Sequence, residues 1–299
     1  MADFYRDFSD FLSERFPGQK LQKITINAGF SCPNRDGTKG RGGCSYCNNE
    51  AFNPSFCSSE MPVTQQIDEG IRFFGRKYPQ MRYLAYFQAY TNTHGEFDRL
   101  RAIYEEALAH PLVDGIIIGT RPDCMPDTLL AYLRLLAEKH FVMVEYGAET
   151  SHDATLDLIN RCHHWGDTVD AVTHTARAGI PIGLHLILGL PGETDDMILQ
   201  TIARASSLPI DIIKLHQLQI IRGTRLAKDF EENRYPIRQF TVDEYIDLCC
   251  RIVDIVPSHI AIERFVSQSP DSLLIAPRWG LKNYQFTSLL HKALARRKS

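Results

Sequence analysis

Short apolar runs alternate with longer amphipathic stretches along most of the chain, and this alternation restricts the fold more than any other sequence feature. The runs are rich in β-branched residues, as strands are, whereas the stretches between them carry apolar residues three and four positions apart, as helices do. Repeated strand–helix units predict parallel strands, in an open sheet or in a barrel. The expected strands are residues 21–27, 83–89, 115–118, 141–146, 180–188 and 212–220.

Polar residues follow each of these expected strands. The carboxyl ends of the strands of a barrel meet at one edge, where the loops carry the chemistry. Loops are polar in most proteins, which explains one or two such segments better than all of them. We therefore expect a functional site at this edge. The segments are 29–32, 90–93, 119–123, 147–150, 189–194 and 222–224.

Length and composition set broad limits on the chain. Its 299 residues, 44% of them hydrophobic, suit one large α/β domain or two ordinary ones. The net charge of -3 argues against charge-driven binding to DNA. Charged residues interrupt the first segment, and no apolar run is long enough to cross a membrane, so we expect a cytoplasmic protein. We expect a core domain over 1–225, with a barrel from about residue 20, and a mostly helical extension over 226–299 packed on it.

Three cysteines lie close together in a glycine-rich segment. Eleven residues separate Cys32 from Cys44, and two separate Cys44 from Cys47. Closed iron–sulfur clusters and structural zinc sites usually take four ligands, so three thiolates leave one position open to a reacting molecule. A zinc site with Cys57 as its fourth ligand is the alternative. The Gly, Asn, Arg and Lys residues around the cysteines argue against inert core positions.

The other cysteines are too widely spaced to suggest a second cluster. Most of them are expected to be small buried residues. Cys249 and Cys250 are neighbours on an expected helix over 241–256, so one of them should face the core. Cys124 and Cys162 follow loops of the expected site, and their approach to it is a hypothesis.

The cysteine segment and the strand-end loops together resemble the radical S-adenosylmethionine (SAM) superfamily. The closest resemblance is to the YhcC-like group, related to the radical SAM domain of the elongator catalytic subunit. It covers about residues 20–225, and the extension resembles the YhcC-like group alone. The long first cysteine gap departs from the usual superfamily spacing but is found in the elongator-like branch. The resemblance implies a partial (βα)6 TIM-like barrel in which Cys32, Cys44 and Cys47 bind a 4Fe–4S cluster and SAM is the cofactor.

The same resemblance implies contacts with SAM. Tyr46 matches the aromatic residue near the adenine, and segment 88–91 lies where the methionine amino group is bound, although the family's glycine pair is absent. Arg161, twelve residues after Glu149, matches an arginine that pairs with the methionine carboxylate by bidentate hydrogen bonds. His185 matches a ribose contact. The residues expected to bind SAM are Tyr46, Gln88, Tyr90, Thr91, Glu149, Arg161 and His185.

Each of these residues also has a purely structural interpretation. Arg161 is alternatively a surface charge at a helix end, and Glu149 a helix cap. His185 is alternatively a core histidine with its hydrogen bonds satisfied. Thr120, Arg121 and Asp123 are alternatively part of a turn around Pro122. Their joint placement after strands favours a site.

The sequence constrains the substrate less than the cofactors. The elongator relatives act on the tRNA wobble uridine with an added acetyltransferase domain, for which this chain is expected to be too short. Our leading hypothesis is a radical SAM enzyme that modifies tRNA at a wobble uridine, with a flavodoxin or ferredoxin as electron donor. The alternatives are a small metabolite or peptide substrate, and a zinc-stabilised, non-catalytic RNA-binding protein. Candidate contacts to a phosphate or acidic substrate, or solvated charges, are Lys214, His216, Arg222 and Arg225.

Overall fold

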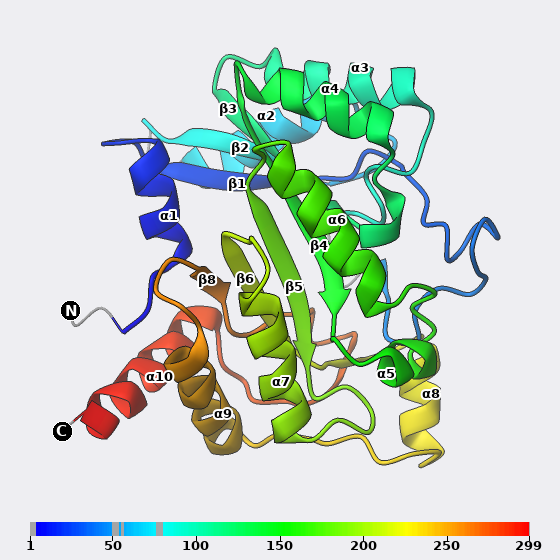
Figure 1. The fold of residues 1–299 in the computed structure, drawn as a ribbon, viewed down its shortest axis with the longest axis vertical. Helices are drawn as coiled ribbons and strands as arrows, with labels where there is room; N and C mark the ends of the chain where they lie inside the picture. Colours follow the sequence, from blue (N-terminus) through cyan, green and yellow to red (C-terminus); the bar gives the residue numbers. More distant parts are fainter. Residues whose placement is uncertain (1–3, 50–53, 55–56, 76–79, 299) are drawn as a thin grey trace.

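One curled, parallel sheet runs through the middle of the molecule (Figure 1). The structure, a computed structural model, describes residues 4–49, 54, 57–75 and 80–298. Within them, seven strands pair in the order β1-β2-β3-β4-β5-β6-β8, every neighbouring pair parallel. The strands are β1 (Leu21–Ile26), β2 (Arg82–Phe87), β3 (Val113–Thr120), β4 (Phe141–Glu149), β5 (Ile182–Leu188), β6 (Ile212–Gln217) and β8 (Ala261–Arg264).

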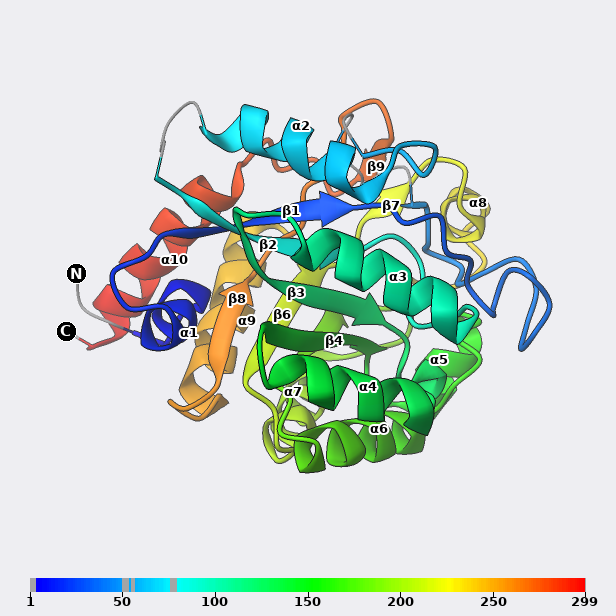
Figure 2. The same cartoon turned by 90° about the horizontal axis from the view of Figure 1, so that it is seen from above.

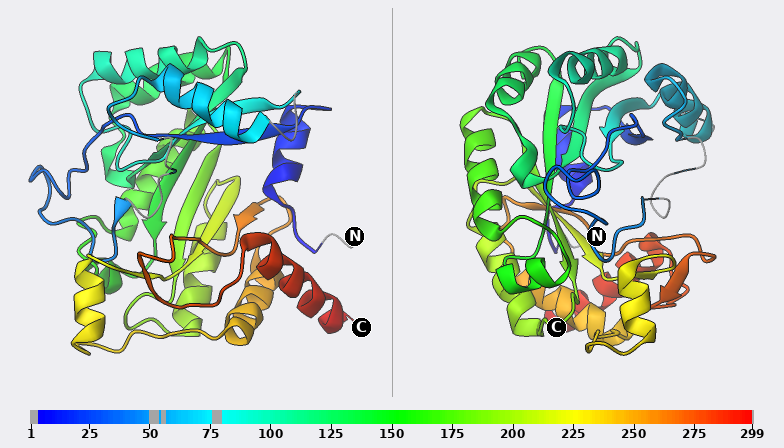
Figure 3. Two further views of the ribbon diagram at one scale, coloured as in Figure 1. Left: turned by 180° about the vertical axis from the view of Figure 1, so that it is seen from behind. Right: turned by 90° about the vertical axis from the view of Figure 1, so that its right-hand side faces the viewer.

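Helices cover the outer face of the sheet, which curls around its inner face (Figures 2 and 3). Several helices begin at residues that satisfy their free backbone N–H groups. Thr194 accepts from the N–H of Met197 at the start of α7, and Thr241 forms a capping box with Glu244 at α9. The helices are α1 (Phe8–Arg15), α2 (Val63–Gly75), α3 (Phe97–Leu108), α4 (Asp127–Ala137), α5 (Asp153–Leu158), α6 (Trp165–Arg177), α7 (Asp195–Ser206), α8 (Arg225–Glu231), α9 (Val242–Ile255) and α10 (Asn283–Lys298).

The inner face of the sheet is layered from its amino to its carboxyl edge, because side chains two positions apart on a strand share a face. An apolar layer lies at the amino edge, where Phe11 of α1 packs against Leu84, Met143 and Ile212. Two positions further along these strands, Tyr86, Glu145 and Lys214 form a buried polar layer. Beyond them the carboxyl edge opens into a pocket. α1 therefore covers the amino edge of the inner face, and the pocket lies at the carboxyl edge.

The expected strands correspond to β1 through β6, and the predicted α/β fold, a partial TIM-like barrel with a helical C-terminal region, is confirmed. The sequence did not indicate β8, which is only four residues long and pairs with β6 as a seventh strand. Residues 220–221 form a separate short strand, β7 (Ile220–Ile221), antiparallel to β9 (Leu274–Ala276). The division at residue 225 stays a prediction, but chain beyond it completes the sheet.

The C-terminal helices α9 and α10 pack on each other beside β8. Trp279 connects the two helices. Its indole stacks on Phe286 of α10 and donates to the carbonyl of Phe240, which lies just before α9. Among the described residues, no helix has the length and apolar character needed to cross a bilayer.

Candidate active site

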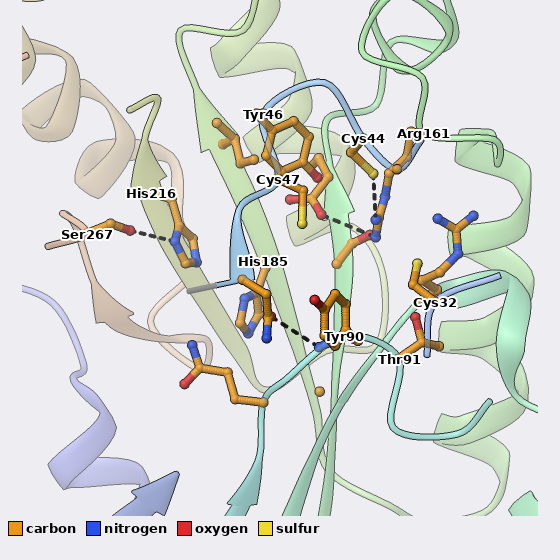
Figure 4. Close-up of a pocket in the computed structure, with 18 of the residues that line it drawn as sticks. Cys32, Cys44, Tyr46, Cys47, Tyr90, Thr91, Arg161, His185, His216 and Ser267 are labelled. Carbon is orange, nitrogen blue, oxygen red and sulfur yellow. Dashed lines mark hydrogen bonds and ion pairs between the residues drawn. The ribbon is translucent and has the colours of Figure 1, made fainter. Parts of the chain in front are cut away.

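All the predicted site residues line one pocket at the carboxyl edge of the sheet (Figure 4). Cys32, Cys44 and Cys47 do so, as do the residues expected to contact SAM. These side chains come from the loops after β1, β2 and α5, from the last residue of β4 and from the strand β5. Their specific roles toward SAM stay predictions. Of the polar segments expected at this edge, 29–32, 90–93, 119–123 and 147–150 contribute side chains to the pocket, whereas 189–194 and 222–224 do not. The shared pocket residues from the SAM group are Tyr46, Gln88, Tyr90, Thr91, Glu149, Arg161 and His185.

The cysteine loop is fixed by hydrogen bonds to distant parts of the chain. The side chain of Asn160, after α5, donates to the carbonyl of Gly43, and the N–H of Ser45 donates to the carbonyl of Ile159. The N–H of Leu226 donates to the carbonyl of Ser45. The segment after β4 and the start of α8 therefore hold Cys44 and Cys47 at the pocket.

Cys57 lies elsewhere. Its thiol donates to the carbonyl of Thr25 and to Oε1 of Gln66, 3.4 and 3.3 Å away, between β1 and α2. Burial raises the pKa of Cys57 to about 12, so this thiol stays protonated. The zinc alternative with Cys57 as fourth ligand is therefore not supported. Among the described residues, no group of three His, Cys, Asp or Glu side chains is arranged to hold one metal ion.

The remaining four cysteines differ in exposure, with Cys124 half-buried and Cys162 exposed. Cys249 and Cys250 are both buried on α9, although only one was expected to face the core. Cys124 contacts Asp123 at 3.5 Å, and Cys162 donates to Oδ1 of Asn34 at 3.1 Å. All four thiols lie outside the group of side chains that lines the pocket.

Two residues that line the pocket with the cysteines carry buried polar atoms without partners. The hydroxyl of Thr91 and Nη1 of Arg121 are buried and have no hydrogen-bond partner in the described part of the chain. Buried polar groups are nearly always paired, so these atoms suit a polar ligand. A SAM molecule offers such groups in its methionine carboxylate and ammonium. Three thiols and these atoms together fit a cluster with bound SAM.

Arg121 is a functional candidate for which the sequence left two interpretations open, a place in the strand-end site or a turn around Pro122. It is almost fully buried, and Asp123 binds its Nε and Nη2 at 2.9 Å each. Lys39, from the cysteine loop, pairs with the same carboxylate at 2.7 Å. Asp123 therefore orients the guanidinium and connects it to the cysteine loop. The sequence feature that indicates a functional role is the position of this arginine directly after a buried strand.

Arg161 is held in the pocket wall. It forms an ion pair with Glu149 at 3.2 Å and donates to Sγ of Cys44 at 3.4 Å and to the carbonyl of Gly147 at 2.6 Å. A Cβ at Gly147 would lie 2.7 Å from Arg161 Nη2, so a side chain there would displace the guanidinium from its present position. Arg161 is buried, and α5 has His152 at its N-cap. The surface-charge and helix-cap alternatives for Arg161 and Glu149 are therefore wrong.

The backbone is strained where two strands enter the pocket. Tyr90 and Glu149 have φ values of 59° and 65°, in the left-handed region that non-glycine residues rarely adopt. Such conformations cost about 1–3 kcal/mol each and are concentrated at functional sites. They turn the chain sharply after β2 and β4 so that both side chains border the pocket.

A buried network of charges underlies the pocket. Glu145 pairs with Lys23 at 2.7 Å and with Lys214 at 3.1 Å. Glu263 of β8 pairs with the same two lysines, at 2.7 and 2.9 Å. Nε2 of His185 lies 2.6 Å from the second oxygen of Glu145. His185 is therefore bound to a network that the sequence interpretation missed, although Lys23 and Glu145 stood out as charges within apolar runs.

His163 makes the stability of the iron-free protein depend on pH. It accepts a hydrogen bond from Arg161, and burial together with Arg161 and Arg121 lowers its pKa to about 3. The unfolded chain takes up a proton at about pH 6.5 while the folded protein does not, so stability falls as the pH drops below 6.5.

We expect His163→Gln, which keeps an acceptor but does not titrate, to lower the pH slope of the unfolding free energy by about 1.4 kcal/mol per pH unit between pH 6 and 5. Urea unfolding at several pH values measures this slope. An unchanged slope would mean that His163 is already protonated in the folded protein.

Comparison with known proteins decides the family. The model of the radical SAM superfamily matches residues 32–205, more than half of the chain, and the radical SAM C-terminal domain matches residues 210–296. The chain belongs to the radical SAM superfamily. It is thus a radical SAM enzyme, whose cofactors are a 4Fe–4S cluster and SAM. The C-terminal match includes β8 and both C-terminal helices.

Individual relatives show which members of the superfamily this chain is similar to. It is 36% identical over 273 residues to the protein YhcC of Escherichia coli, covering 91% of this chain and 86% of that protein. It is 25% identical over 181 residues to the tRNA uridine(34) acetyltransferase of Methanocaldococcus jannaschii, covering 59% of this chain but only 32% of that enzyme. The solved archaeal Elp3 of Methanocaldococcus infernus shares the fold, with a TM-score of 0.70 at 16% identity, over 94% of this chain and 64% of that one.

Proposed function

We propose that this radical SAM enzyme modifies a tRNA at the wobble uridine. The observation that carries the proposal is the similarity to a tRNA uridine(34) acetyltransferase, which extends over 181 residues. The fold shared with archaeal Elp3 supports the same proposal. Because the chain spans about a third of that acetyltransferase, the group added to the base is left open.

The mouth of the pocket carries side chains suited to RNA. Tyr90 is 37% exposed, and the guanidinium of Arg35 lies over its ring at 5.5 Å from the centroid. Unpaired RNA bases stack on aromatic rings and guanidinium planes. Arg222 and Arg225 are exposed near the start of α8, which is hydrogen-bonded to the cysteine loop. An anticodon loop would find stacking and positive charge there.

The proposed chemistry divides the pocket residues by role. Cys32, Cys44 and Cys47 would hold the cluster and leave one iron for SAM. When bound, the cluster and SAM would supply radical chemistry that removes a hydrogen atom from the substrate. Arg161 and the hydroxyl of Thr91 would orient the methionine part of SAM. A flavodoxin or ferredoxin would provide the electron.

The test compares 5′-deoxyadenosine release with and without RNA. Anaerobically reconstituted protein is given SAM and dithionite, and then an unmodified tRNA with uridine at position 34. We expect the tRNA to increase the rate of release and to gain a new nucleoside in its digest. The same tRNA carrying adenosine at position 34 is the control. A rate that no tRNA changes, with stimulation by a small metabolite or peptide instead, would reject the proposal.

A further inference from the structure

Arg121 carries a buried positive charge beside the cysteines. It lies directly after β3 and lines the same pocket as Cys32, Cys44 and Cys47. The residue is only 2% exposed, so water and salt screen its guanidinium weakly. A charge buried in this way acts more strongly on its neighbours than a surface charge, because the effective dielectric constant is lower. Whatever occupies the cysteine site therefore lies within the field of this guanidinium.

Asp123 holds the guanidinium by one edge. Its two carboxylate oxygens lie 2.9 Å from Nε and from Nη2 of Arg121. A guanidinium is planar and rigid, so this two-point contact fixes its orientation and leaves Nη1 unused. Nη1 is buried and has no hydrogen-bond partner in the described part of the chain. Of these two residues, Arg121 lines the pocket of the cysteines and Asp123 does not.

Positive charges outnumber negative ones around Arg121. Asp123 also pairs with Lys39 of the cysteine loop at 2.7 Å, so two cations share one carboxylate. The neighbouring Arg161 has a carboxylate of its own, that of Glu149 at 3.2 Å. Three cations and two carboxylates leave one positive charge in excess among these five residues.

The guanidinium of Arg121 stays charged despite its burial. Burial and Arg161 oppose the positive charge. Asp123 and Cys44 outweigh them, and the pKa of Arg121 is raised above its ordinary value. His163 adds no charge near neutral pH, because burial together with Arg161 and Arg121 lowers its pKa to about 3. Cys44 is therefore close enough to interact electrostatically with Arg121, and the excess positive charge persists there.

We propose that Arg121 favours reduction of the cluster, because its buried charge stabilises the more negative state, and that Asp123 and Lys39 are its positioning residues. Reduction transfers one electron from the reductant to the cluster, and no bond is made or broken. Net charge and solvent exposure are among the factors that set the reduction potential of an iron–sulfur cluster. An excess positive charge beside three thiolates shifts that potential upward. This role requires only the cluster and is independent of the substrate.

The test is a redox titration of the cluster without SAM. Anaerobically reconstituted protein is reduced stepwise with dithionite and redox mediators, and the loss of visible absorbance gives the reduced fraction. We expect the uncharged Arg121→Met to lower the ratio of reduced to oxidised cluster at a fixed potential about tenfold, equal to about 59 mV for one electron. Arg121→Lys, which keeps the charge, should recover most of the native ratio.

Asp123→Asn gives a shift of opposite sign. It removes a negative charge and keeps the shape of the side chain, so the same ratio should rise above the native value. A general loss of structure would move both variants in one direction, whereas an effect of charge moves them apart. If Arg121→Met binds no iron, Asp123→Asn decides alone, and a ratio that does not rise would overturn the proposal.

Arg82→Met is the matched control. Asp114 binds Nε and Nη2 of Arg82 in the same way, but at the amino end of β2 and outside the group of residues that lines the pocket. This variant should keep the native ratio, and iron content verifies that each protein holds a cluster. A native ratio in Arg121→Met, or shifts of Arg121→Met and Asp123→Asn in the same direction, would overturn the proposal. An unchanged ratio with weaker SAM binding in equilibrium dialysis would instead assign Arg121 to the methionine carboxylate.

Discussion

Replacing Cys44 with alanine is expected to abolish both iron binding and 5′-deoxyadenosine release. The pocket offers three cysteine thiols to the cluster, and each would bind a different iron, so the loss of one leaves an iron without a protein ligand. Cys44 is also the thiol that Arg161 contacts, at 3.4 Å. The measurements are iron content, absorbance near 400 nm and 5′-deoxyadenosine after addition of SAM and dithionite.

Cys57→Ala is the matched control for this experiment. The same atom is removed from a buried cysteine, but from one that bonds to Thr25 and Gln66 outside the pocket. We expect this variant to bind iron and cleave SAM at the native rate. A colourless native protein that loads one zinc, and that loses the zinc in both variants, would refute the cluster assignment and restore the zinc alternative.

Replacing Glu145 with alanine is expected to cause the largest loss of stability. Its side chain is 1% exposed and lies between Lys23, Lys214 and His185. Without it, two buried lysines would share the single carboxylate of Glu263. Removing one partner of a buried pair typically costs about 3–5 kcal/mol, because the remaining charge stays buried. Urea unfolding of the iron-free protein measures the change.

Glu69→Ala removes the same group from an exposed pair of equal length. Glu69 binds Arg72 at 2.7 Å on the surface of α2, and such pairs contribute at most about 1 kcal/mol. The two substitutions thus differ mainly in burial. If Glu145→Ala costs no more than Glu69→Ala, water reaches the lysines and the network is not a buried one.

Most of the fold and the position of the site were predictable because they depend on local patterns. Apolar runs of four to nine residues predicted the strands β1 through β6. Functional residues usually lie at the carboxyl ends of parallel strands, and this rule predicted that Cys32, Glu149 and His185 meet at one edge of the sheet. These residues are between 36 and 153 positions apart in the sequence, yet strand order alone makes them neighbours.

What escaped prediction depends on long-range partners. Lys23 and Glu145 are single charges in apolar runs, and nothing in either run names the other as partner 122 residues away. Glu263 was hidden for a second reason, since β8 is too short to show a strand pattern and follows a helix. Arg121 fitted a turn as well as a site, and only its burial decides between them.

The late position of β8 in the chain has a consequence for biosynthesis. Lys214 leaves the ribosome 49 residues ahead of Glu263, and His216 precedes Ser267 by 51. Until β8 docks, a nascent chain holds two lysines against one glutamate in its interior, and the His216 ring lacks its contact with Ser267. Closure of this interior therefore awaits translation of β8 and the residues just after it. A ribosome stalled before that point would display a sheet whose cysteine loop is complete while Glu263 and Ser267 are missing.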